Sequence, residues 1–329
     1  MKPAITGILA ALLVLISMQS STAATMEDCL LEALQNAGED TTVGSLRQRC
    51  SQATPAPAAP DDEPTVLERR IASEYDTMDR DYILTLHNPN YILLFTYNDK
   101  VNREPWIPIG TPEQVAAISE EEMVFQISGK MPLWRNMFSK NMDLYFGYTQ
   151  KNWWQIYTNE EDVSAPFRET NYEPEVFARY FGGPGLPFGG KIAGLDAGYI
   201  HQSNGKAGSL SRSWDRVIGR AAFDYGDLAF LLRAWYAFDE SDENPSMHRY
   251  LGYGDLRAIW APNRNTFTAM FRPGTEKYAY ELTWSFQVTS AFRLYAQWFN
   301  GYGESLLDYN VRTNRYGIGI AFSDFLMNE

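Results

Sequence analysis

The sequence predicts an all-β chain, a twelve-stranded antiparallel transmembrane β-barrel preceded by a short helical and proline-rich segment. Three observations predict this class: aromatic residues make up 14% of the chain, glycine occurs 24 times, and the later part alternates in polarity over short runs. Alternation places apolar side chains on one face of a strand and polar ones on the other. Such strands cross hydrocarbon only as a closed barrel, because an open edge would leave backbone groups unpaired.

The first 23 residues have the pattern of a secretory signal peptide. Lys2 provides a positive start, residues 5–18 are mainly apolar, and small residues offer a cleavage site after Ala23 or Ala24. A permanent helical anchor is the alternative, but the apolar run is short for a bilayer and the small residues follow at once. We therefore assign residues 1–23 to a signal peptide and expect an exported protein.

Residues 24–80 form a predicted periplasmic segment that holds the only two cysteines of the chain. In an exported protein we expect Cys29 and Cys50 to form a disulfide, which would staple two short helical patterns into a hairpin. A metal site is not favoured there, because two thiols have no histidine nearby. The proline-rich, acidic residues 53–64 should form an extended, solvated linker.

Residues 81–329 are assigned to the barrel itself. About twelve runs have the alternation of strands, and bacterial outer-membrane barrels require an even number. The runs begin near Tyr91, Met123, Asp143, Val176, Ile192 and Ser213, and continue with 228–237, 250–260, 266–271, 278–287, 292–300 and 315–323. The last run places Tyr316, Ile318, Ile320 and Phe322 on one face. A soluble β-sandwich is the alternative architecture, and the strand lengths do not favour it.

Net charge and aromatic content indicate which partners and which environment the chain has. A net charge of -13 argues against nucleic acid as a partner, because the chain has no excess of cations to neutralise phosphates. Tryptophan and tyrosine are enriched where a membrane protein meets the lipid headgroups. We therefore expect the following tryptophans in the interface girdles: Trp153, Trp154, Trp214, Trp235, Trp260 and Trp298.

The most informative stretch contains His201, Ser203 and Asp215. If it is a strand, His201 and Ser203 project from one face, and a turn within 206–210 would return Asp215 beside His201. A serine needs a base to remove its proton, and the base needs a third group that orients it. We therefore interpret Ser203 as a nucleophile, His201 as its base and Asp215 as the orienting acid.

The strand face that carries these residues indicates the class of substrate. It also carries Leu195, Ala197 and Tyr199 and is the more apolar face, so we expect it to contact lipid. A polar site that faces lipid is costly unless it has a function, and its natural substrate is the lipid. The Gly205 that follows can turn a backbone N–H toward an oxyanion. Taken alone, a histidine near a serine could equally be an ordinary polar part of the wall.

These motifs resemble the outer membrane phospholipase A family, which consists of twelve-stranded, calcium-dependent lipases. The resemblance runs from about Tyr82 to the C-terminus and implies hydrolysis of sn-1 and sn-2 acyl esters of glycerophospholipids and lysophospholipids in a Gram-negative outer membrane. It assigns the same three triad roles, although the best-known members carry asparagine where this chain has Asp215. The similar stretches are Tyr148 to Gln150, Trp153 to Gln155, Ser164 to Pro174, His201 to Gly205, Ser211 to Arg216 and Gly301 to Leu306.

The resemblance also implies a calcium ion and an active homodimer. Gly205 would supply the oxyanion-hole N–H, and Gln150 would lie buried at the dimer contact within the membrane. Some relatives have an acidic residue where this chain has Gly208, so it lacks that ligand for an additional calcium site. The implied calcium ligands are the Ser211 hydroxyl, the Lys206 backbone carbonyl and Ser164 of the partner subunit.

Two other functions are compatible with a barrel. A passive outer-membrane porin would have a roomy, polar lumen and would not need His201 beside Ser203. An outer-membrane protease would use pairs of carboxylates with a histidine at the extracellular mouth, and we do not find that pattern in the sequence.

Overall fold

The computed structural model describes residues 65, 67–72, 84–139, 141–158, 167–238 and 244–323. The predicted signal peptide, the hairpin with Cys29 and Cys50, most of the linker and Ser164 lie outside these residues. The chain divides into two units, Met1–Glu63 and Pro64–Glu329, and the description below concerns the second. Within the described ranges, no helix has the length and apolar character needed to span a membrane.

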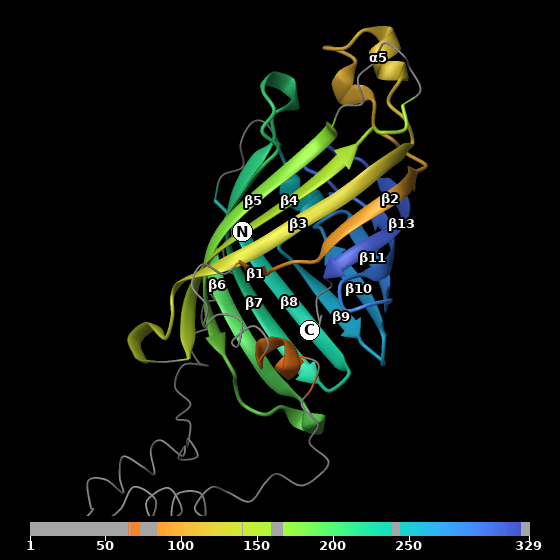
Figure 1. Ribbon diagram of the computed structural model, residues 1–329. Coiled ribbons are helices and arrows are strands. Elements are labelled where there is room, and N and C mark those ends of the chain that lie inside the picture. The colour runs from red at the N-terminus through yellow and green to blue at the C-terminus, as the bar shows by residue number, and fades with distance from the viewer. Residues whose placement is uncertain are drawn as a thin grey trace, which may run out of the picture. The chain divides into compact units, whose positions relative to one another are not determined.

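The second unit is a closed antiparallel β-barrel (Figure 1). Strands β2 to β13 follow one another around the wall, and β13 pairs with β2 to close it. The short β1 continues the line of β2 along β3. The strands are β1 Thr85–Leu86, β2 Asn90–Asn98, β3 Glu121–Trp134, β4 Met142–Trp154, β5 Phe167–Phe181, β6 Lys191–Ser203, β7 Ser213–Tyr225, β8 Leu228–Ala237, β9 Gly254–Trp260, β10 Asn265–Pro273, β11 Tyr278–Gln287, β12 Arg293–Gly301 and β13 Thr313–Ser323.

The prediction of a twelve-stranded antiparallel barrel is confirmed, with two strands that differ in their bounds. The strand predicted to begin near Val176 begins at Phe167, where β5 already pairs with Trp154 of β4. Residues 250–260 were predicted as one strand, but β9 begins at Gly254 because α6 (Met247–Leu251) precedes it. Gly252 ends this helix with φ +64°, a conformation that favours glycine. The other short helices lie in the connections: α5 Pro112–Ala116, η2 Glu104–Trp106, η3 Met137–Ser139, η4 Pro187–Gly189 and η5 Gly208–Leu210.

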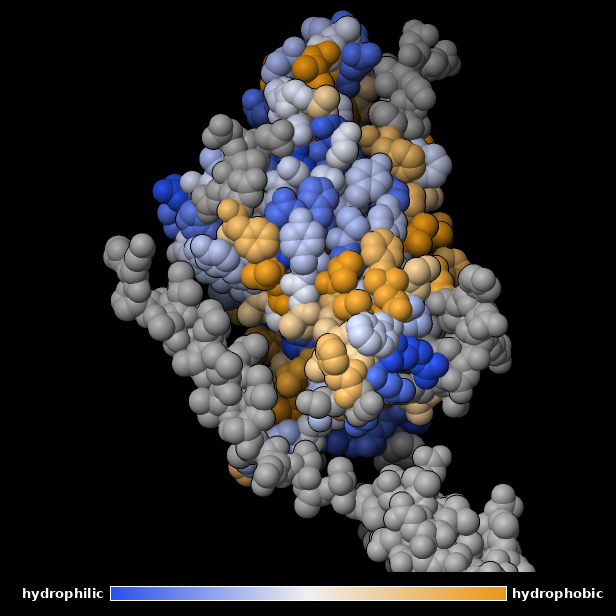
Figure 2. All heavy atoms as spheres, turned by 90° about the vertical axis from the view of Figure 1, so that its left-hand side faces the viewer, coloured by the Kyte–Doolittle hydropathy of each residue, from blue (hydrophilic) through white to orange (hydrophobic). Residues whose placement is uncertain are grey.

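The outer wall is apolar, as alternation predicts. On β13, Tyr316, Ile318 and Phe322 are 52%, 64% and 46% exposed, whereas Ala321 is fully buried. Figure 2 shows apolar side chains gathered across one side of the wall, with more hydrophilic regions above and below them. A band of this kind is what the hydrocarbon of a membrane requires of strands that cross it.

Charged pairs lie in the interior of the barrel. Arg168 bonds Glu122 and Asp308, with N–O distances of 2.6 and 2.7 Å, and Arg315 reaches Glu122 at 2.8 Å and Glu304 at 2.9 Å. All five side chains are almost completely buried. Buried charges require such partners, so this network specifies how the interior packs.

Three of the tryptophans predicted for the interface girdles lie inside instead. Trp153, Trp214 and Trp235 are at most 6% exposed, so the girdle prediction is wrong for them. The indole N–H groups of Trp214 and Trp235 donate to Gln202 Oε1 and to the carbonyl of Gly252. Acceptors in a polar lumen can therefore satisfy an indole N–H, as groups at the membrane surface do. Trp260, 51% exposed, lies outside.

A short helix over residues 67–72 packs on the barrel. Leu67 is 8% exposed and joins Ala193, Ala229 and Ile259 in an apolar cluster. The Thr65 hydroxyl donates to Asp224, and Glu68 forms an ion pair with Lys191. This helix is therefore attached to the barrel by both apolar and polar contacts.

Candidate active site

Strands β6 and β7 bring two of the three triad residues side by side. The strands pair antiparallel with His201 directly opposite Asp215, and Ser203 opposite Ser213. His201 Nδ1 lies 2.9 Å from Asp215 Oδ1. This contact leaves Nε2 of the imidazole free for another partner, which is the arrangement a histidine base needs.

Ser203 follows His201 on the same face of β6, two positions further along the strand. Among the described residues, the Ser203 hydroxyl makes no hydrogen bond with the His201 ring. Hydrogen bonds between a nucleophile and its base are often long in a ligand-free site and shorten when substrate binds. The backbone therefore places the Ser203 hydroxyl on the same face as the His201 ring.

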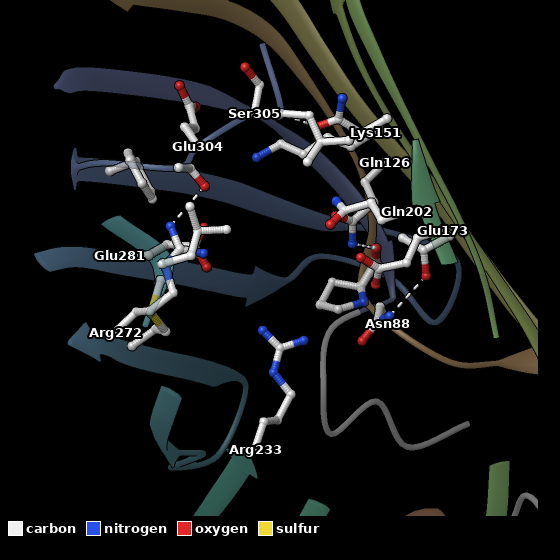
Figure 3. A pocket seen from close by; sticks show the side chains of 18 of the residues that line it. Asn88, Gln126, Lys151, Glu173, Gln202, Arg233, Arg272, Glu281, Glu304 and Ser305 are labelled. Carbon is white, nitrogen blue, oxygen red and sulfur yellow. Dashed lines mark hydrogen bonds between the residues drawn. The ribbon is translucent and has the colours of Figure 1, made fainter. Parts of the chain in front are cut away.

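The residues of the predicted triad lie on the outer face of the barrel. The residues that alternate with them, Gln202, Trp214 and Arg216, line a cavity of about 170 Å³ inside the barrel, where Figure 3 shows Gln202. Because side chains alternate along a strand, the triad must point the other way. The side chains of His201 and Asp215 are 39% and 29% exposed.

Asn204 organises the loop that joins β6 to β7. It is 3% exposed, and its Oδ1 accepts the N–H groups of Lys206 and Arg212 at 3.2 and 3.0 Å. Its Nδ2 donates to the carbonyl of Leu210 at 2.8 Å and to Glu169 Oε2 at 3.4 Å. An asparagine before a glycine commonly bonds backbone groups in a turn, but the sequence could not show the contact with Glu169.

Gly205 occupies a position that only glycine fits well. Its φ is +64°, and a Cβ there would lie 2.9 Å from Cε2 of the Tyr172 ring. No acceptor among the described residues takes the Gly205 N–H. The group is therefore available to a ligand at the end of β6 that carries Ser203.

Two predicted calcium ligands lie on the same loop. Neither the Lys206 carbonyl nor the Ser211 hydroxyl has a hydrogen-bond donor among the described residues, so both oxygens can accept a cation. Uncharged oxygen ligands suit calcium. The described side chains contain no cluster of three or more acidic, histidine or cysteine ligands.

The Lys206 side chain lies at the same loop as these oxygens. Its ammonium is 4.8 Å from the centre of the Trp106 ring, and burial lowers the pKa of this lysine.

Gln150 lies on the outer face of β4, in the row that leads to Ser203. It is opposite Tyr172 on β5, which in turn is opposite Ser203 on β6. Its neighbours Thr149 and Lys151 line the inner cavity, so Gln150 points outward. The Tyr148 hydroxyl donates to Gln150 Oε1 at 2.8 Å, and Gln150 Nε2 donates to Asn152 Oδ1 at 2.9 Å.

Sequence reasoning missed a second partner of Asp215. The Tyr199 hydroxyl donates a hydrogen bond to the same Asp215 Oδ1 that contacts His201. Period-two spacing from His201 places Tyr199 on this face, but it could not show that the ring reaches the next strand.

Comparisons with known proteins identify the family of the chain. The phospholipase A1 family model matches residues 67–322. The chain is 38% identical over 252 residues to the "Putative phospholipase A1" of Neisseria meningitidis serogroup B, covering 72% of this chain and 65% of that protein. It is 34% identical over 266 residues to phospholipase A1 of Escherichia coli, covering 80% of this chain and 89% of that protein.

Two solved structures extend the similarity to the fold. Outer membrane phospholipase A from Escherichia coli matches with a TM-score of 0.70 and 33% identity, over 74% of this chain and all of that chain. The calcium-bound dimer of Salmonella typhi outer membrane phospholipase matches with a TM-score of 0.71 and 32% identity, over 76% and 96%. The chain therefore belongs to the phospholipase A1 family of hydrolases and is an outer-membrane β-barrel of the Gram-negative type.

Proposed function

We propose that this chain is a calcium-dependent phospholipase that hydrolyses sn-1 and sn-2 acyl esters of glycerophospholipids and lysophospholipids on the lipid-facing wall of the barrel. One observation carries the assignment of the site: His201 Nδ1 lies 2.9 Å from Asp215 Oδ1 on the outer face, two residues from Ser203. A histidine that contacts a carboxylate through Nδ1 presents Nε2 to a serine, which is the arrangement of an acyl-transfer site.

Ser203 attacks the ester carbonyl while His201 takes its proton, and the leaving alcohol or lysophospholipid then receives that proton. Asp215 holds the imidazole in the required orientation and stabilises its protonated form. The free N–H of Gly205 donates to the oxyanion. A water then attacks the acyl-enzyme with His201 again as the base, which releases the fatty acid and restores Ser203.

Calcium, when bound, would add positive charge that stabilises the oxyanion. The Lys206 carbonyl and the Ser211 hydroxyl would hold it, together with Ser164 of the partner subunit. Since the described loop offers only uncharged oxygens, a second subunit and bound substrate would complete the site.

Dimerisation would regulate the enzyme. The Salmonella typhi relative is described as a dimer with bound calcium. We expect two outer walls to meet near Gln150, whose amide can hydrogen-bond across an apolar contact, a gain on the order of 1 kcal/mol. Crosslinking during the assay tests this point, because an active monomer at low calcium would contradict it.

A lipase assay on mixed micelles, with calcium or with a chelator, tests the function. Ser203→Ala should lose ester cleavage and keep the folded barrel, and chelation should silence the wild type. Ser213→Ala is the matched control, since Ser213 lies opposite Ser203 on β7 and should remain active. Full activity of Ser203→Ala would refute the site. Conductance without hydrolysis would favour a passive porin, although buried ion pairs lie in the described interior.

A further inference from the structure

We propose that Tyr199 is a positioning residue for Asp215, with the task of holding this carboxylate against His201 at the lipid boundary. The inference rests on the proposed function and extends it to a residue outside the triad. The motifs compared above start at His201 and leave Tyr199 without a role.

The register of β6 and β7 places Tyr199 within reach of Asp215. His201 is opposite Asp215, and Tyr199 is opposite Val217, so Tyr199 and Asp215 are diagonal neighbours on the outer face. A diagonal neighbour lies within reach of a long aromatic side chain. The Tyr199 hydroxyl reaches Asp215 Oδ1 and donates to it.

Phe238 contacts both Tyr199 and Asp215. The Tyr199 ring stacks on Phe238, with centroids 6.1 Å apart and planes 4° apart. The N–H of Phe238 donates to the Asp215 carbonyl at 3.2 Å. One residue of the neighbouring segment therefore fixes the ring of Tyr199 and the backbone of Asp215 together, so the position of the phenol relative to the carboxylate is set.

The Tyr199 phenol can stabilise the charge of Asp215. Asp215 is an anion on a wall that faces hydrocarbon, where it loses much of the water that would otherwise solvate it. A phenol donor replaces part of that solvation, and hydrogen bonds to a charged group are stronger than neutral ones. Both donors act on Oδ1, so Tyr199 also favours the rotamer in which this oxygen contacts His201.

The chemistry predicts that the contribution of Tyr199 depends on the charge of residue 215. Tyr199→Phe should lower kcat about tenfold and change KM less than about twofold, because the hydroxyl bonds the triad. In the Asp215→Asn background the same change should lower kcat at most about threefold, since a neutral amide accepts a weaker bond.

Tyr236→Phe is the matched control. Tyr236 is opposite Val217 on β8, so it has the same diagonal relation to Asp215 from the other side, and its hydroxyl makes no hydrogen bond among the described residues. Its removal should leave kcat within about twofold of wild type. Unfolding midpoints in detergent check that all variants remain folded.

The outcomes separate the two proposals. If Ser203→Ala is inactive while Tyr199→Phe behaves like Tyr236→Phe, or loses the same factor in both Asp215 backgrounds, the role of Tyr199 is refuted and the triad stands. If Ser203→Ala keeps full activity, both proposals fail.

Discussion

The loop between β6 and β7 depends on one buried side chain, which makes Asn204→Ala the sharpest test of how calcium is held. The change removes four side-chain hydrogen bonds, to the N–H groups of Lys206 and Arg212, to the Leu210 carbonyl and to Glu169. Each bond contributes about 0.5–1.5 kcal/mol net, and we take a total of about 3 kcal/mol because one bond is long.

This loss of loop stability raises the calcium concentration that the enzyme needs. About 3 kcal/mol lowers the population of the ordered loop by up to about 100-fold, and calcium affinity falls with the competent fraction. We expect the calcium concentration for half-maximal hydrolysis to rise at least about tenfold, while maximal activity at saturating calcium is largely recovered. Titration of micellar hydrolysis with calcium measures both values.

A pair of further variants tests the cause. Asn204→Asp keeps the oxygen that accepts the two N–H groups, but it places a carboxylate against the Leu210 carbonyl and against Glu169 across the present 3.4 Å contact. It should therefore perform no better than Asn204→Ala. Adding Glu169→Gln restores a donor between the two residues and should recover part of the loss, since the bond to the Leu210 carbonyl stays absent. Asn314→Ala on β13 serves as the control, since Asn314 bonds Asp99 and Trp298 away from this loop. A wild-type calcium requirement in Asn204→Ala, or no recovery in the double variant, would refute the reasoning.

Three further predictions concern the same loop. Gly205→Ala should lower kcat at least about tenfold in the lipase assay, because φ is +64° and the new Cβ would press on Tyr172; wild-type kcat would exclude an oxyanion role for this N–H. Gly208→Asp should lower the calcium requirement several-fold, since a Cβ there meets no atom within 4 Å, aspartate tolerates the φ of +62° better than most residues, and a carboxylate adds a ligand; an unchanged titration would contradict it. Burial lowers the pKa of Lys206, so the unfolded chain binds the extra proton and stability should rise as pH increases from the lowered pKa to that of ordinary lysine. Lys206→Met should lack this rise in unfolding midpoint, and a rise that persists would assign it to another group.

The sequence alone predicted the barrel and the strand face on which the candidate site lies. Alternation is a local property, so it predicts strands and their two faces without knowledge of the partners. His201 and Ser203 are two residues apart, and their shared face follows from that spacing. Asp215 lies just past a short turn, so its place beside His201 required only that β6 and β7 form a hairpin.

Tertiary structure decided what depends on contacts between distant residues. Asn204 meets Glu169 across 35 positions of sequence, and no local pattern links them. Trp214 and Trp235 turned inward because a polar lumen also offers acceptors for an indole N–H, so composition could not distinguish lumen from membrane surface. The bond from Tyr199 to Asp215 likewise depends on the register and on the direction of one ring, which only the assembled wall determines.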